Sequence, residues 1–148
     1  MHTERTSRIL VIASETADGL ALSESIRRSA ARHDRVEVLV VSPALNSRLR
    51  HWTSDTDKAR SSAEARLERC LRRLRKHGIV AHGCIGDAEP LLALHDALAQ
   101  FPADEIIVST HPPGASNWLE RDVVERARAE TGRRVIHVYD ASLSLEAV

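Results

Sequence analysis

Net positive charge, long hydrophobic runs and secretion signals are all missing from this sequence. Lys plus Arg and Asp plus Glu both number 21, so the formal net charge is zero at pH 7. A nucleic-acid binder that relies on bulk positive charge is therefore not expected. No apolar run approaches the roughly 20 residues of a membrane span, and no signal peptide is recognisable. We expect a cytoplasmic protein that binds neither nucleic acid nor a membrane.

Cysteines are also few, and the sequence shows no recognisable set of metal ligands or catalytic residues. Cys70 and Cys84 are the only cysteines, and neither belongs to the paired motifs of a structural zinc site. In the cytoplasm both would stay reduced. His82 and Cys84 alternate onto one face of an expected strand, but nothing in the spacing of nearby residues completes a metal site. No nucleophile and base can be paired from the sequence either, so we expect no metal, no catalytic residue and no enzymatic activity.

What the sequence does contain is an alternation of short apolar runs with longer amphipathic segments. At 148 residues, the chain has the length of one ordinary domain, with a core over about residues 8–140. The apolar runs at 8–13, 36–41, 79–85, 105–109 and 135–139 suit strands buried on both faces. The pattern predicts an α/β fold, a three-layer α/β/α sandwich around a parallel sheet of five strands.

Helical periods and capping residues fill the spaces between these runs. Gly78 and Gly132 stand where left-handed caps end helices, and Asp87 is placed to cap a helix with Pro90 in its first turn. Residues 42–60 form the only long connection that we expect. Arg66, Arg69, Arg73 and Lys76 make a basic stripe that Glu64 and Glu68 interrupt, which is more typical of a solvated helix face than of a nucleic-acid surface.

The stretch from "ADEIIVSTHPPG" to "GRRVIHV" resembles the C-terminal half of a universal stress protein domain, and the order of elements over 8–139 is similar to that family's throughout. The resemblance implies a five-stranded parallel sheet in the order 3-2-1-4-5 with two helices on each face. It also implies that a homodimer is a common assembly in this family. Some members of the family bind ATP and others do not.

The family's nucleotide-binding members carry two glycines, then a glycine and a hydroxyl residue, from the end of the fourth strand onward. Alignment on His111 places these positions on Ser109, Pro112, Asp122 and Val123, so all four depart. Proline has no amide hydrogen to offer a phosphate. An acidic residue that such members often carry after the first strand is also missing, because Ala13 and Ser14 stand there.

The chemistry of these residues, considered without the family, also argues against a phosphate site at this position. Asn117 and Glu120 have the spacing of a capping box, so the helix that follows would satisfy its own first amides. The carboxylate of Asp122 would repel a phosphate about 5 Å away by about 3 kcal/mol at an effective dielectric near 20. His111 has no recognisable partner for acid–base work, and Trp118 suits a packing role more than stacking on a base. We therefore expect a self-capped turn rather than a phosphate site.

These observations favour a non-enzymatic, universal-stress-like regulatory domain that acts by dimerisation or by binding a protein partner. The alternative is a small-molecule binder, with an adenine nucleotide such as ATP or AMP as a candidate and no other cofactor expected. Its site would lie at the carboxyl ends of the strands, beside the reversal of strand order. The residues that would line it are Ala13, Ser14, Ser42, Gly86, Thr110, His111, Gly114, Ala115, Ser116 and Asn117.

The fifth expected strand, at 135–139, would lie at an edge of the sheet. Its interior has no Pro, Lys or Gly to discourage pairing with another chain. We expect a homodimer through this edge, with Ile136 and Val138 on one face of the strand. In the alternative, Leu143 and Leu145 of the C-terminal segment cover the edge and leave a monomer.

Overall fold

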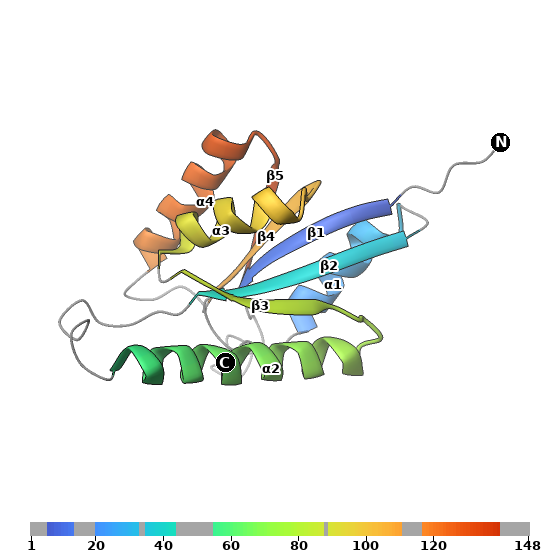
Figure 1. Ribbon diagram of the computed structural model, residues 1–148. Helices are drawn as coiled ribbons and strands as arrows, with labels where there is room; N and C mark the ends of the chain where they lie inside the picture. The colour runs from blue at the N-terminus through green and yellow to red at the C-terminus, as the bar shows by residue number, and fades with distance from the viewer. Residues whose placement is uncertain are drawn as a thin grey trace, which may run out of the picture.

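The computed structural model describes residues 6–13, 20–32, 35–43, 55–87, 89–110 and 117–139, in which strands and helices alternate (Figure 1). The strands are β1 (Thr6–Ala13), β2 (Arg35–Pro43), β3 (His82–Gly86), β4 (Glu105–Thr110) and β5 (Arg134–Tyr139). The helices are α1 (Leu20–Ala30), α2 (Asp55–Lys76), α3 (Pro90–Gln100) and α4 (Asn117–Thr131).

The strands form one sheet in the order β3-β2-β1-β4-β5, and every neighbouring pair is parallel. This confirms the predicted fold class and strand order. Strand β1 lies in the middle, where Leu10 stands beside Leu39 of β2 and Ile106 of β4. The chain first builds outward from β1 to β3, then crosses back and builds from β4 to β5 on the other side. The strand order therefore reverses at β1.

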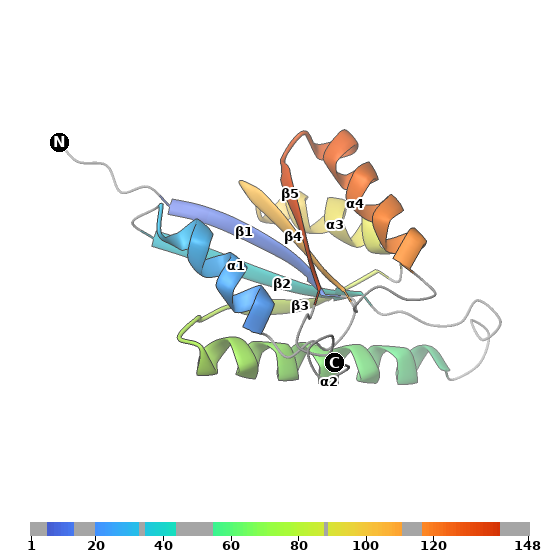
Figure 2. The ribbon, with the colours of Figure 1, turned by 180° about the vertical axis from the view of Figure 1, so that it is seen from behind.

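Helices cover both faces of the sheet, as Figures 1 and 2 show from opposite sides. The core is accordingly divided into two layers. In one layer, Leu22 and Ile26 of α1 and Leu67 and Leu74 of α2 pack on the sheet. In the other, Leu94 of α3 and Val124 and Ala127 of α4 do so. We call these the α1/α2 face and the α3/α4 face. Two helices on each face is the arrangement that the sequence predicted.

Two element boundaries differ from the sequence-based expectation. Helix α2 begins at Asp55, so the long connection predicted over 42–60 is wrong at its end. No Pro or Gly interrupts the residues of α2, and nothing local stops the helix from extending. Strand β3 begins at His82 rather than 79, because Gly78 (φ +81°) and the bond from Ile79 N to Leu74 O (2.9 Å) still belong to the end of α2.

The start of α3 is capped by a residue other than the predicted one. Glu89 is the N-cap, and its side chain accepts from the backbone N–H of Leu91 (3.3 Å). Asp87, which the sequence suggested, lies two residues earlier and accepts from the N–H of Glu89 (2.9 Å). Pro90 occupies the first turn as predicted, where its missing amide hydrogen does no harm.

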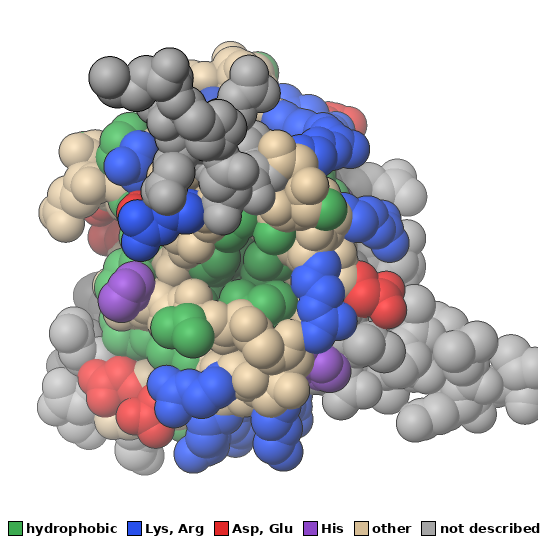
Figure 3. All heavy atoms as spheres, turned by 90° about the vertical axis from the view of Figure 1, so that its right-hand side faces the viewer, with side chains coloured by type: hydrophobic (Ala, Val, Ile, Leu, Met, Phe, Trp, Pro, Cys, Tyr) green, Lys and Arg blue, Asp and Glu red, His purple; other side chains and the backbone are tan. Residues whose placement is uncertain are grey.

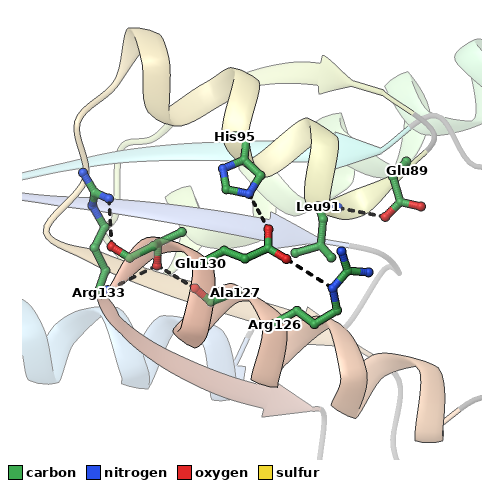
Figure 4. Close-up of polar contacts among 8 residues, drawn as sticks. Glu89, Leu91, His95, Arg126, Ala127, Glu130 and Arg133 are labelled. Carbon is green, nitrogen blue, oxygen red and sulfur yellow. Dashed lines mark hydrogen bonds and ion pairs between the residues drawn. The ribbon is translucent and has the colours of Figure 1, made fainter.

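A polar contact ties α3 to α4 on the outside of the molecule (Figure 4). His95 Nε2 donates to Glu130 Oε1 (2.7 Å), and Arg126 Nε donates to Glu130 Oε2 (3.2 Å). The hydrogen bond from His95 is the largest influence on the pKa of the Glu130 carboxyl and lowers it. Partial burial opposes this effect, and Arg126 lowers the pKa further. The carboxylate is thus favoured over the neutral acid when the protein is folded.

The lowered pKa of Glu130 makes a prediction about acid stability. A carboxyl with a lower pKa in the folded state stabilises the fold above its ordinary pKa, and that stabilisation is lost as the pH falls through the folded value. Glu130→Gln should therefore flatten the decline of unfolding free energy between roughly pH 5 and pH 3. Urea titrations at a series of pH values measure this. Glu125→Gln, an exposed change on the same helix, is the control, and equal slopes in the two variants would refute the assignment.

Two glycines of β3 generate a packing prediction. A Cβ at Gly86 would lie 2.7 Å from Ala93 Cβ and 2.7 Å from Val41 Cγ1, whereas a Cβ at Gly83 would meet only the ends of the Leu67 and Leu71 side chains. Leucine ends can move aside, but a short alanine side chain on a packed helix cannot. Gly86→Ala should lower the free energy of unfolding by about 1–3 kcal/mol, and Gly83→Ala by clearly less. Urea unfolding compares them, and a Gly86→Ala protein as stable as wild type would contradict the packing.

Candidate functional site

Four of the residues predicted to line a site lie together at the carboxyl ends of the strands. Ala13 ends β1, Gly86 ends β3, Thr110 ends β4, and Ser42 is the penultimate residue of β2. We call this end of the sheet the carboxyl edge; it is on the left in Figure 1. The strand order reverses at β1, and α/β proteins bind ligands outside the carboxyl ends of strands at such a reversal.

The last row of side chains on the α1/α2 face is unusually small in its centre. Ala13 stands beside Ser109 of β4, and the β1–β2 register places Ser42 on its other side. All three are buried, with exposed fractions of 6%, 2% and 0%. Larger side chains stand outside them, because Ser42 pairs with Ile85 and Ser109 with Val138. The centre of the carboxyl edge therefore presents two hydroxyls separated by a methyl group.

Ser42 is the residue of this row whose hydroxyl has no hydrogen-bond partner among the described residues. Its Oγ is fully buried. A buried hydroxyl without a partner is unfavourable by about 1–3 kcal/mol, and such groups are uncommon in folded proteins. The hydroxyl of Ser42 could therefore donate to or accept from a further group at the carboxyl edge.

The other predicted lining residues are divided. Gly86 faces the α3/α4 side, against Ala93 and Val41, so it is separated by the sheet from the row around Ala13. Asn117 is the first residue of α4. The remaining five lie outside the described residues, namely Ser14, His111, Gly114, Ala115 and Ser116.

Three of the four positions of the family's phosphate motif are described. Ser109 is buried in the sheet. Asp122 is exposed near the start of α4, so water weakens the repulsion that we estimated from the sequence for a nearby phosphate. Val123 is partly buried and packs against the core of the α3/α4 face. The side chain at the hydroxyl position of the motif thus packs against the core. Pro112 lies outside the described residues.

Arg66 is a site residue that the sequence interpretation missed. It was placed on a solvated face of α2, but it is partly buried, and its Nη2 donates to the carbonyl of Pro43 at the end of β2 (3.2 Å). The solvated-face interpretation is therefore wrong for this residue. The signal was present in the sequence, since Arg66 follows Ala63 by three and precedes Cys70 by four, which places it on the apolar face of the helix.

The two cysteines are poor nucleophiles in this fold. Burial raises the pKa of the Cys70 thiol to about 11, although Arg73 nearby acts in the opposite direction. Burial also raises the pKa of Cys84, which is an exposed residue of the edge strand β3. Both are therefore protonated at neutral pH. Among the described residues, no three His, Cys, Asp or Glu side chains come close enough together to hold a metal ion.

The opposite end of the sheet, where the strands begin, has a different character (Figure 3). A hollow with hydrophobic side chains on its floor opens in the middle of this face, and Lys and Arg side chains gather along its lower margin, where α2 ends. Arg73, Arg75 and Lys76 are the basic residues of the last turn of α2. Cations at a helix C-terminus interact favourably with the helix dipole, so this accumulation has a structural explanation.

No helix in the described part of the chain combines the length and the hydropathy that a membrane crossing requires.

Comparison with known proteins gives no match to a protein-family model and none to a curated protein sequence. Solved structures do match, over most of their length. A universal stress protein in complex with cAMP is 15% identical, with a TM-score of 0.61 over 88% of this chain and 96% of its own. A universal stress protein from Archaeoglobus fulgidus is 20% identical, with a TM-score of 0.62 over 88% and 92%.

A third similar structure is a universal stress protein family member from Arabidopsis thaliana with AMP bound. It is 12% identical, with a TM-score of 0.57 over 93% of this chain and 94% of its own. The chain therefore has the fold of the universal stress proteins, as the resemblance in the sequence predicted. At these identities the likeness shows the fold alone.

Proposed function

We propose that this protein is a regulatory domain of the universal-stress type that has no enzymatic activity and acts by dimerisation or by binding a protein partner. The observation that carries the proposal is the state of the phosphate motif. Val123 packs against the core in place of the hydroxyl residue, and Asp122 puts an exposed carboxylate in place of a glycine. A domain with these residues at the start of α4 would not depend on binding the phosphate groups of ATP there.

Three further observations are consistent with a role without catalysis and with the proposed compartment. Burial keeps both thiols protonated at neutral pH. The described residues bring no metal-ligand cluster together. Cys70 and Cys84 are free rather than joined in a disulfide, which is the usual state in a reducing compartment. A cytoplasmic, non-catalytic role accords with all three.

The edge of the sheet at β5 is the surface that we propose for the homodimer. Strand β5 is paired with β4 on one side, and the described residues place no strand on its other side. Val135 is buried on the α3/α4 face, while Ile136 and Val138 pack on the α1/α2 face. The side chains thus hold the strand in the sheet. The carbonyl of Val135 already accepts from Arg128 (3.3 and 3.0 Å), so the proposed contact with a second chain uses other backbone groups of the strand.

The first functional prediction concerns ATP. The wild-type protein should bind ATP with no affinity better than roughly 100 µM. Combining Pro112→Gly, Asp122→Gly and Val123→Ser should increase the affinity, because these changes remove a carboxylate and restore amide and hydroxyl donors. Isothermal titration calorimetry measures both proteins, and Asp122→Asn is the control that removes only the charge. Tight ATP binding by the wild type would show that the motif is not needed.

The second concerns assembly. In sedimentation equilibrium at high micromolar concentration, the wild-type protein should have twice its chain mass of 16.4 kDa. Ile136→Lys and Val138→Lys should weaken the dimer, because a charge on either side chain disturbs the strand that forms the contact. Far-UV circular dichroism separates loss of the dimer from loss of the fold. A wild-type monomer under these conditions would contradict the proposal and favour the alternative in which the C-terminal segment covers the edge.

A second candidate function is the binding of a small molecule, such as an adenine nucleotide, at the carboxyl edge. The observation that favours it is the buried hydroxyl of Ser42, which has no partner among the described residues. Proteins of the same fold have been solved with cAMP and with AMP, so the fold accommodates such ligands. The residues proposed to line this site are the ten named from the sequence, and the row of Ser42, Ala13 and Ser109 forms its described centre.

A further inference from the structure

Four buried side-chain polar atoms lack a hydrogen-bond partner in the described part of the chain: Oγ of Ser7, Ser23 and Ser42, and Nε of Arg66. Ser7 lies near the start of β1 and Ser23 lies on α1. The other two, from β2 and α2, are associated in space although 24 positions separate them in the sequence. Two unsatisfied donors in one place are more informative than two scattered ones.

The association follows from one hydrogen bond and from the alternation of strand residues. Arg66 Nη2 donates to the carbonyl of Pro43 (3.2 Å), which places the guanidinium at the carboxyl end of β2. Val40 belongs to the core of the α1/α2 face, and side chains two residues apart point to the same face. Ser42 therefore also points to the side that α2 covers (Figure 1), so both groups lie on that side of the end of β2.

The guanidinium of Arg66 has more donors than the described residues satisfy. An arginine offers five N–H groups, and the acceptor found for them among the described residues is the single carbonyl of Pro43. No carboxylate in that part of the chain forms an ion pair with Arg66, whereas other carboxylates do pair with arginines, as Glu37 does with Arg8 (3.2 Å). A partly buried cation is unfavourable unless it is paired, and since the described residues supply no counter-charge to Arg66, a bound anion is the partner that we consider for it.

We infer that Arg66 and Ser42 form a receptor for an oxyanion, the carboxylate or phosphate group of a small ligand bound at the carboxyl edge. The planar guanidinium binds such groups through parallel N–H donors, and the Ser42 hydroxyl supplies another donor beside it. The inference rests on the second candidate function and names the chemistry of its ligand. In this proposal the anion binds at α2, on the other side of β1. It does not bind at the start of α4, where the residues of the phosphate motif are missing.

The experiment measures binding of four probes by isothermal titration calorimetry at constant ionic strength: inorganic phosphate, AMP, succinate and adenosine. Phosphate and AMP carry a phosphate group, succinate carries carboxylates, and adenosine carries no anion, so the set distinguishes the two sources of an oxyanion. We expect saturable binding of at least one anionic probe by the wild type. Arg66→Gln should raise its Kd by at least about tenfold, because a charged, forked set of donors is lost.

Three further variants make the result specific. Arg66→Lys keeps the charge but loses the fork, so its Kd should lie between those of wild type and Arg66→Gln. Ser42→Ala should raise the Kd a few-fold. Arg72→Gln is the matched control, since it removes the same charge from an exposed position of the same helix, and it should leave the Kd unchanged. If Arg66→Gln does not fold, Arg66→Lys and Ser42→Ala carry the comparison.

A second measurement, by NMR on the wild-type protein, does not depend on the stability of any variant. The Nε–H resonance of Arg66, assigned by its loss in Arg66→Lys, should shift in ¹H–¹⁵N spectra of the wild type when the anionic probe is added. Failure of every anionic probe to bind the wild type, or an equal effect of Arg66→Gln and Arg72→Gln, would overturn the receptor and leave water as the partner of these groups. If AMP and adenosine bound with equal affinity and Arg66→Gln weakened neither, the small-molecule function would stand while the anion receptor would be refuted.

Discussion

Strand β1 is hydrogen-bonded to β2 on one side and to β4 on the other, and helices pack on both of its faces. Its residues Ile9, Leu10 and Val11 have no solvent exposure. Because all neighbouring elements contact this one strand, it fixes the register of the two halves of the sheet relative to each other. It also fixes the point at which the strand order reverses, and with it the location of the carboxyl edge.

The carboxyl edge inherits its chemistry from that constraint. Side chains at the ends of β2, β1 and β4 meet there because the strands are parallel and in register, and on the α1/α2 face these are Ser42, Ala13 and Ser109. In relatives of this fold that hold ATP, the resemblance implies glycines and a hydroxyl at the start of the fourth helix. In this chain, Val123 packs against the core of the α3/α4 face instead. Arg66 of α2 lies at the carboxyl edge on the α1/α2 face, at the end of β2.

The two faces of the sheet differ in their polar contacts. On the α3/α4 side, Val123 packs against the core and His95 contacts Glu130 on the outside of the molecule. On the α1/α2 side, a buried hydroxyl and a guanidinium remain incompletely satisfied among the described residues. Fold and function are separable in this way because the sheet is held by its aliphatic core, whereas recognition depends on a few polar side chains at one edge.

The sequence by itself determined the types and order of the elements, and the family resemblance extended this to the strand order. Continuous apolar runs, helical periods and the glycine caps at Gly78 and Gly132 are local signals. The sequence also placed Ala13, Ser42, Gly86 and Thr110 at the carboxyl ends of their strands, since parallel strands end on the same side. Only the tertiary structure decided which polar residues lie inside. His95 is exposed and contacts Glu130 on the outside of the molecule, whereas Arg66, which the sequence assigned to a solvated face, is partly buried and contacts Pro43. Burial of such a residue depends on where its helix lies over the sheet, which contacts between distant segments decide.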